Sequence, residues 1–222
     1  MTSRTRILIV DDHEIVRQGL KMVLELEADF EVVSEAGSGA EAIRQVAIHR
    51  PDLLLLDLVM PDMSGIEVSQ VIKAAQPQVR ILMLTGVGAE AAVKQSIKVG
   101  VEGYILKNVS PDVLCVAIRT VRDEGGYLHP VVVQMITGQP VNKAGGYAPQ
   151  QTSEHSLGLT PREIEVLQMM ATSQTNRDIA EKLFIGEETV RTHVKRILNK
   201  LDQPNRTQAV LFGLKAGLIW LE

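Results

Sequence analysis

Short apolar runs alternate with helical spacing along the first half of the chain. Five runs, most of them rich in valine, isoleucine and leucine, predict strands at Arg6–Val10, Phe30–Ala36, Leu53–Asp57, Arg80–Thr85 and Gly103–Leu106. The segments that follow them space apolar residues at helical intervals and predict helices at His13–Glu27, Ser38–His49, Gly65–Ala75, Ala89–Val99 and Pro111–Glu124. Five strand–helix units in this order predict an α/β fold, a five-stranded doubly wound parallel sheet with helices on both faces.

The last part of the chain carries helical signals only. Thr160-Pro161-Arg162-Glu163 is a capping box that begins a first helix. Three more amphipathic segments follow, at Asn176–Phe184, Glu188–Leu201 and Arg206–Ala216. The pattern predicts a small all-α domain of four helices.

Glycine and proline are concentrated between these two parts. The stretch from Gly125 to Gly158 holds six glycines and three prolines, which is typical of an interdomain linker. Val131–Ile136 within it is apolar enough to form a short helix. We therefore predict a domain at residues 5–125, a linker at 126–157 and a second domain at 158–222.

Composition and charge narrow the class of protein. The chain has 222 residues, 45% of them hydrophobic, and a net charge of −4. Its uncharged apolar runs are far shorter than a membrane span, and its single cysteine, Cys115, excludes an intramolecular disulfide, so we expect a cytoplasmic protein with no membrane partner. Residues 1–155 carry a net charge of −5 and residues 156–222 a net charge of +1, which favours a local polyanion-binding surface in the second domain.

Polar and charged groups follow four of the five predicted strands. They are Asp11 and Asp12 after the first strand, Asp57 at the third, Thr85 at the fourth and Lys107 after the fifth. Ligands of an open α/β sheet bind at the carboxyl ends of its strands, so these groups should converge. Clustered carboxylates repel each other unless a cation lies between them, and Mg²⁺ suits such oxygen ligands. A carboxylate beside Mg²⁺ and a lysine is a plausible nucleophile for phosphoryl transfer.

Several spaced motifs in the first half resemble those of one family. They are Ile9-Val10-Asp11-Asp12-His13, the run from Leu55 to Gly65, Met83-Leu84-Thr85 and Gly103-Tyr104-Ile105-Leu106-Lys107. Together they resemble the CheY-like receiver domain of two-component response regulators. The resemblance implies strand order 2-1-3-4-5 and a switch that is phosphorylated on an aspartate by a sensor histidine kinase.

The resemblance also assigns roles by position. Asp57 is then the phosphoacceptor, Lys107 pairs with the phosphoryl group, Thr85 bonds it, and Tyr104 is the aromatic that turns inward on activation. Mg²⁺ is bound by Asp12, by Asp57 and by the backbone carbonyl of Val59, and Asp11 reaches it through water.

One helix of the second domain has a polar face suited to DNA. Arg191, Thr192, Lys195 and Asn199 share one side of Glu188–Leu201, and because the acids stop at Glu188 we expect that face to be purely cationic. Helix-turn-helix proteins place such side chains against base edges and phosphates in the major groove.

The second domain resembles the LuxR/NarL-type helix-turn-helix family. The motifs are Leu159-Thr160-Pro161-Arg162-Glu163, Asn176-Arg177-Asp178-Ile179-Ala180, the run from Glu188 to Val194, and Arg206-Thr207-Gln208-Ala209-Val210. By family position Arg191, Thr192 and Lys195 face base edges, whereas Thr175, Thr189 and His193 lie near the DNA backbone. Arg206–Ala216 is the dimer-forming helix, in which Val210 and Leu214 are candidates for the partner face. The sequence departs from the family at Gly186, where serine often caps the recognition helix.

We therefore predict a DNA-binding response regulator that forms a homodimer when phosphorylated and controls transcription, with RNA polymerase as a further partner that the resemblance allows. It would assist its own phosphorylation and dephosphorylation without being an enzyme with a turnover substrate. The main alternative is a phosphorylation-independent DNA-binding regulator whose receiver is a protein-interaction module. A metal-dependent phosphohydrolase that uses Asp57 is an alternative of another class.

Overall fold

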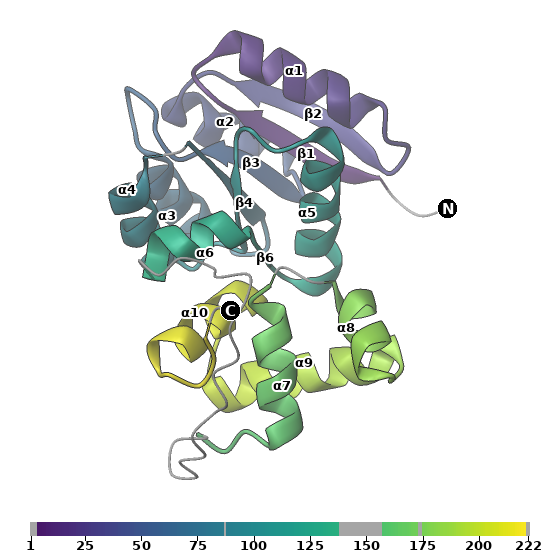
Figure 1. The fold of residues 1–222 in the computed structure, drawn as a ribbon. Helices are drawn as coiled ribbons and strands as arrows, with labels where there is room; N and C mark the ends of the chain where they lie inside the picture. Colours follow the sequence, from purple (N-terminus) through teal and green to yellow (C-terminus); the bar gives the residue numbers. More distant parts are fainter. Residues whose placement is uncertain (1–3, 87, 138–156, 173–174, 221–222) are drawn as a thin grey trace.

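The chain folds into an α/β part and an all-helical part that lie against each other (Figure 1). The structure is a computed structural model that describes residues 4–86, 88–137, 157–172 and 175–220. In Figure 1 the α/β part occupies the upper half, and the helical part, coloured green to yellow, lies below it.

A parallel sheet of six strands forms the centre of the α/β part. Its strands are β1 (Thr5–Val10), β2 (Phe30–Ala36), β3 (Leu53–Asp57), β4 (Arg80–Thr85), β5 (Gly103–Leu106) and β6 (Tyr127–Leu128). They lie in the order β2-β1-β3-β4-β5-β6. The predicted order 2-1-3-4-5 is thus confirmed, with one strand added at the edge beside β5. Residues of β1, β3 and β4 are almost completely buried, as expected for strands covered on both faces.

Helices cover both faces of this sheet. They are α1 (Glu14–Glu25), α2 (Gly39–His49), α3 (Gly65–Ala75), α4 (Glu90–Ser96) with the 3₁₀ turn Ile97–Val99, and α5 (Pro111–Glu124). Helices α1 and α5 share an apolar cluster with one face, and α2, α3 and α4 share a second cluster with the other. Among the described residues, no helix combines the length and the apolarity that a membrane span requires.

The chain that follows α5 belongs partly to the sheet. We predicted a linker from residue 126, but β6 pairs in parallel with β5 and α6 (Pro130–Thr137) packs against α4 and β5. The predicted short helix at Val131–Ile136 is confirmed, whereas the sixth strand was missed because two residues are too short to show a strand pattern. Residues 138–156 of the predicted linker lie outside the described residues.

The described residues of the C-terminal part form four helices, as predicted. They are α7 (Pro161–Met170), α8 (Asn176–Leu183), α9 (Glu187–Leu201) and α10 (Arg206–Lys215). Thr160 and Thr175 form capping boxes at the starts of α7 and α8, but Gly186 gives α9 no side-chain cap. The backbone of Asp202 ends α9 in the left-handed conformation, with φ of 51°.

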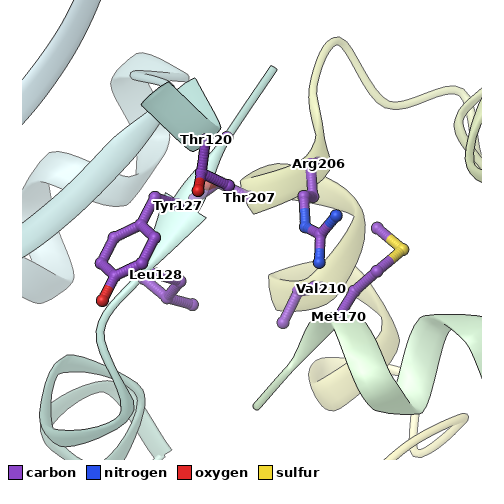
Figure 2. Close-up of a pocket in the computed structure, with 8 residues that line it drawn as sticks. Thr120, Tyr127, Leu128, Met170, Arg206, Thr207 and Val210 are labelled. Atoms are coloured by element: carbon purple, nitrogen blue, oxygen red, sulfur yellow. The ribbon is translucent and has the colours of Figure 1, made fainter. Parts of the chain in front are cut away.

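Helix α10 attaches the helical part to the α/β part. Three side chains near its start reach backbone carbonyls: Thr207 donates to Glu102, Asn205 to Gly100 over 2.9 Å, and Gln208 to Ile97 over 3.1 Å. One apolar cluster runs from the sheet through β6 and α6 into the helical core. Figure 2 shows the narrow pocket at this contact, which is lined by Thr120, Tyr127, Leu128, Met170, Arg206, Thr207 and Val210.

We expect Leu128→Ala to lower the free energy of unfolding by about 2–5 kcal/mol, because Leu128 is 3% exposed within the apolar cluster. Urea unfolding followed by circular dichroism measures this. Val71→Ala removes an exposed side chain of similar type and should change the free energy by less than about 0.5 kcal/mol. Equal effects of the two changes would show that β6 is not part of the core.

Candidate functional site

The sheet brings Asp11 and Asp57 to one pocket. Strands β1 and β3 are neighbours and pair Val10 with Leu56, so the residue after each member of this pair stands at the same edge of the sheet. Asp11 is fully buried and Asp57 is 3% exposed. The backbone N–H of Val59 donates to Asp57 Oδ1 over 3.2 Å and fixes the orientation of this carboxylate.

Lys107 joins the two carboxylates. Its Nζ lies 2.6 Å from Asp11 Oδ2 and 2.6 Å from Asp57 Oδ2. The backbone N–H of Lys107 donates to the Thr85 carbonyl over 2.9 Å, so strand pairing continues up to the lysine and places it over the pocket. The convergence predicted for Asp11, Asp57 and Lys107 is therefore present.

Burial and ion pairing act in opposite directions on these groups. Burial raises the pKa of the Asp57 carboxyl more than the hydrogen bond from Lys107 lowers it. For Lys107, burial lowers the pKa of the ammonium, but hydrogen bonds to Asp11 and Asp57 outweigh burial and leave the pKa raised. The ionised form of Asp57 therefore lowers the stability of the folded protein, whereas the raised pKa of Lys107 keeps the ammonium charged.

The acidic edge of the pocket fits a divalent cation. Asp11, Asp12, His13 and Asp57 each offer one ligand atom, and these atoms all lie within 4.8 Å of one another. Asp12 Oδ1 is buried and makes no hydrogen bond with any described residue, although His13 Nδ1 lies 2.9 Å from it. A buried carboxylate oxygen without a hydrogen bond, beside three other possible ligand atoms, would be satisfied by an oxygen-binding cation such as Mg²⁺.

His13 is a member of this pocket that the sequence reasoning did not place there. Its Nδ1 lies 2.9 Å from Asp12 Oδ1 and 3.2 Å from Asp11 Oδ1, and its backbone N–H donates to Asp11 Oδ1. Its position directly after Asp12, before a helix start, was the available signal.

The remaining predicted pocket residues lie on the same strands or just after them. Thr85 is fully buried, and its hydroxyl donates to the carbonyl of Gly86 over 3.3 Å. Tyr104 is also fully buried, and burial raises the pKa of its phenol. Val59 is 61% exposed beside Asp57.

Two further residues hold the loop after β3. Asp62 accepts from the backbone N–H groups of Gly39 and Ala40 at the start of α2, and these hydrogen bonds lower the pKa of its carboxyl. A Cβ at Gly65 would lie 2.3 Å from the carbonyl oxygen of Asp57, so only glycine fits there. These contacts hold the second half of the loop, from Asp62 to Gly65.

Helix α9 carries the candidate DNA-binding face. Val190, Val194 and Ile197 are buried against the other helices, which leaves the opposite side exposed. The exposed residues of the predicted set are Thr189, Arg191, Thr192, Lys195 and Asn199.

The prediction that this face is purely cationic was wrong. Arg191 Nη2 lies 2.7 Å from Glu187 Oε1, and Arg191 Nη1 lies 3.2 Å from Glu188 Oε1. These acids stand four and three residues earlier on the helix, which is the spacing that brings side chains together. The helix begins one residue earlier than predicted, and this places Glu187 on the same face.

Other predicted contacts are less exposed. The Thr175 hydroxyl donates to Asp178 in the capping box, and His193 is half-buried. Val210 is 1% exposed and lines the pocket between the two parts, whereas Leu214 is half-buried. Val210 therefore faces the α/β part of its own chain in this arrangement (Figure 2).

Comparisons with known proteins define the class. Residues 7–119 match the family described as "Response regulator receiver domain", and residues 157–212 match "Bacterial regulatory proteins, luxR family". The response regulator protein VraR of Staphylococcus aureus is 39% identical over 215 residues, which are 96% of this chain and 98% of that protein.

Solved structures agree with these matches. The crystal structure of the response regulator ChrA of a heme-sensing two-component system covers 99% of this chain and 100% of its own, with 31% identity and a TM-score of 0.54. A structure of two RcsB dimers bound to two parallel DNAs covers 95% and 98%, with 25% identity and a TM-score of 0.56.

An acidic pocket at the strand ends and a helix-turn-helix module define a regulator with a receiver and a DNA-binding domain. The chain belongs to the NarL/LuxR family of two-component response regulators. Members of this family regulate transcription, and a receiver joined to a DNA-binding domain is generally not an enzyme.

We expect Asp57→Asn to raise the free energy of unfolding of the metal-free protein at neutral pH, on the order of 1 kcal/mol. Because burial raises the Asp57 pKa, the ionised carboxylate destabilises the fold, and a neutral amide of the same shape removes that cost. The gain should shrink as the pH falls and the wild-type carboxyl binds its proton. Thermal unfolding in a chelating buffer measures both effects.

Asp62→Asn is the matched control, and it should lower stability, because hydrogen bonds lower the Asp62 pKa and so favour its charged form. A loss of stability in Asp57→Asn would contradict the expected electrostatic cost.

Proposed function

We propose that this response regulator is phosphorylated on Asp57 by a sensor histidine kinase and that the modification controls its affinity for double-stranded DNA. The observation that carries the proposal is the Lys107 ammonium, 2.6 Å from the carboxylates of both Asp11 and Asp57. A buried carboxylate with a fixed cation and a second acid beside it is arranged to accept a phosphoryl group.

In the proposed reaction an Asp57 oxygen attacks the phosphorus of a phosphohistidine, the P–N bond breaks and the imidazole leaves. Lys107 then donates to a phosphoryl oxygen. The Thr85 hydroxyl, which now donates to the Gly86 carbonyl, turns to a second phosphoryl oxygen. Tyr104, which the resemblance expects to turn inward on activation, is already fully buried in this arrangement.

The acids of the pocket would hold Mg²⁺. We assign Asp12, Asp57 and the Val59 carbonyl as direct ligands and Asp11 as a ligand through water. The buried Asp12 Oδ1, which makes no hydrogen bond with a described residue, supports this. When bound, the ion neutralises charge on the phosphoryl oxygens.

In the helical domain Arg191, Thr192 and Lys195 would read base edges from the exposed face of α9, with Asn199 on the same face. Arg191 must first leave Glu187 and Glu188. Thr175, Thr189 and His193 would lie near the DNA backbone. The protein would then act in the cytoplasm, where bacterial DNA lies.

A dimer through Val210 and Leu214 requires α10 to separate from the receiver, since Val210 is covered by it here. The similarity to RcsB, which was solved as dimers bound to DNA, supports a dimeric DNA-bound form of this chain. We further propose that the DNA-bound protein contacts RNA polymerase. We keep the predicted domains at residues 5–125 and 158–222 and propose that β6 and α6, in the predicted linker 126–157, belong structurally with the receiver.

Incubation with acetyl phosphate and Mg²⁺ tests the acceptor. The wild-type protein should gain an adduct of ~80 Da by intact-mass spectrometry, and Asp57→Asn should gain none. Asp12→Asn should label slowly, because it removes a metal ligand, whereas Asp112→Asn on the exposed start of α5 should label fully. Full labelling of Asp57→Asn would identify another acceptor, and an unlabelled wild type would favour the phosphorylation-independent alternative.

Lys195→Ala tests the DNA face. If Lys195 reads a base edge, affinity for a duplex selected from a random pool should fall by about 1–3 kcal/mol, with a much smaller loss on unselected DNA. Fluorescence anisotropy measures both. Lys182→Ala removes an exposed cation on α8 and serves as the control. Equal losses on both duplexes with a reduced salt dependence would assign Lys195 to a phosphate instead.

A further inference from the structure

One carboxylate of the receiver is bound inside the helical domain. Glu124 ends α5, and its Oε2 lies 2.8 Å from Arg206 Nη1, whereas its Oε1 accepts the backbone N–H of Asn176 over 2.8 Å. The side chains of Arg206 and Glu124 are 4% and 10% exposed. Arg206 Nη1 also donates to Asn176 Oδ1 over 3.0 Å, which fixes the guanidinium at the start of α8.

These donors form an anion site that belongs to the helical domain alone. Asn176 is the first residue of α8, where unpaired N–H groups and the helix dipole favour negative charge. Arg206, on α10, adds a full positive charge to the same point. Arg191 of the recognition helix contributes a weaker favourable electrostatic interaction with Glu124. The Glu124 carboxylate of the receiver already accepts hydrogen bonds from these donors. This contact shows that the site binds an oxyanion.

The position of the site suggests its natural ligand. Helix α8 is the first helix of the helix-turn-helix, the one that crosses the DNA backbone when the second helix enters the major groove. Backbone N–H groups at helix N-termini and arginine side chains are common phosphate contacts in such complexes. The site also lies close enough to Arg191, on the predicted reading face, to interact with it electrostatically.

We propose that the Asn176 N–H and the Arg206 guanidinium form a binding site for one DNA backbone phosphate, and that Glu124 occupies this site when the receiver is docked. The inference rests on the proposed DNA-binding function and names a contact of that interface. Carboxylate and phosphate oxygens compete for the same donors, so docking of α5 and full engagement of DNA exclude each other at this point.

The electrostatics of Glu124 are consistent with a displaceable occupant. Burial raises the pKa of its carboxyl more than Arg206 and Asn176 lower it. The carboxylate therefore loses hydration at a cost in free energy that its interactions with Arg206, Asn176 and Arg191 do not fully offset. A phosphate on the surface of a duplex carries its charge without such burial.

The test uses the full-length chain and a labelled duplex of random sequence, because phosphate contacts do not depend on base sequence. Glu124→Ala removes the competing carboxylate. Asp123→Ala, at the neighbouring exposed position, makes the same change in net charge and is the matched control. Affinity is measured by fluorescence anisotropy between about 50 and 200 mM salt, without acetyl phosphate.

Glu124→Ala should bind the random duplex at least about fivefold more tightly than wild type. Its plot of log affinity against log salt should be steeper by about 0.9, the increment for one added phosphate contact. Asp123→Ala should change neither quantity by a comparable amount. Equal changes in the two variants, or an unchanged slope in Glu124→Ala, would overturn the proposal.

Amide hydrogen exchange at Asn176 gives a second readout that needs no change in Arg206. The amide should be protected in the free wild-type protein, exposed in free Glu124→Ala, and protected again when that variant binds the duplex. Continued rapid exchange in the complex would overturn the phosphate assignment. Wild-type protein treated with acetyl phosphate is measured in parallel: if it binds no duplex at all, the proposed function fails and this inference falls with it.

Discussion

Two carboxylates buried at neighbouring strand ends repel each other, and the Lys107 ammonium between them offsets part of that repulsion. Asp11 and Asp57 lie on adjacent strands, and both are almost completely inaccessible to water. The lysine reaches them only because β5 ends at the same edge of the sheet. A covalent anion on Asp57 would change the charge that Lys107 must balance, so the pocket is built to respond to that modification.

Strand β5 connects this pocket with the contact between the domains. Lys107 follows its last residue, Tyr104 lies within it, and Glu102 precedes it. The Glu102 carbonyl accepts from Thr207 of α10 and from the backbone of Tyr127 in β6. Any displacement of β5 at the phosphorylation pocket therefore acts on the strand that holds the helical domain. The strand is only four residues long, so the two regions share one short element.

The sequence predicts what depends on local pattern and misses what depends on docking. Strands β3 to β5 begin and end where their apolar runs do, because burial on both faces leaves few polar positions within them. The acidic pocket could be predicted because Asp11, Asp57 and Lys107 stand at the ends of predicted strands. The bond between Glu124 and Arg206 joins positions 82 residues apart, so no local pattern predicts it. Its one signal was an acid in the last turn of α5, where the helix dipole favours a cation.

The most direct measurement is the affinity for a selected duplex before and after treatment with acetyl phosphate and Mg²⁺, with Asp57→Asn treated in parallel. If a phosphoryl group on Asp57 controls DNA binding, the treated wild type should bind at least about fivefold more tightly, and the variant should not respond. Equal affinity of modified and unmodified wild-type protein would contradict the link between the pocket and the DNA-binding domain.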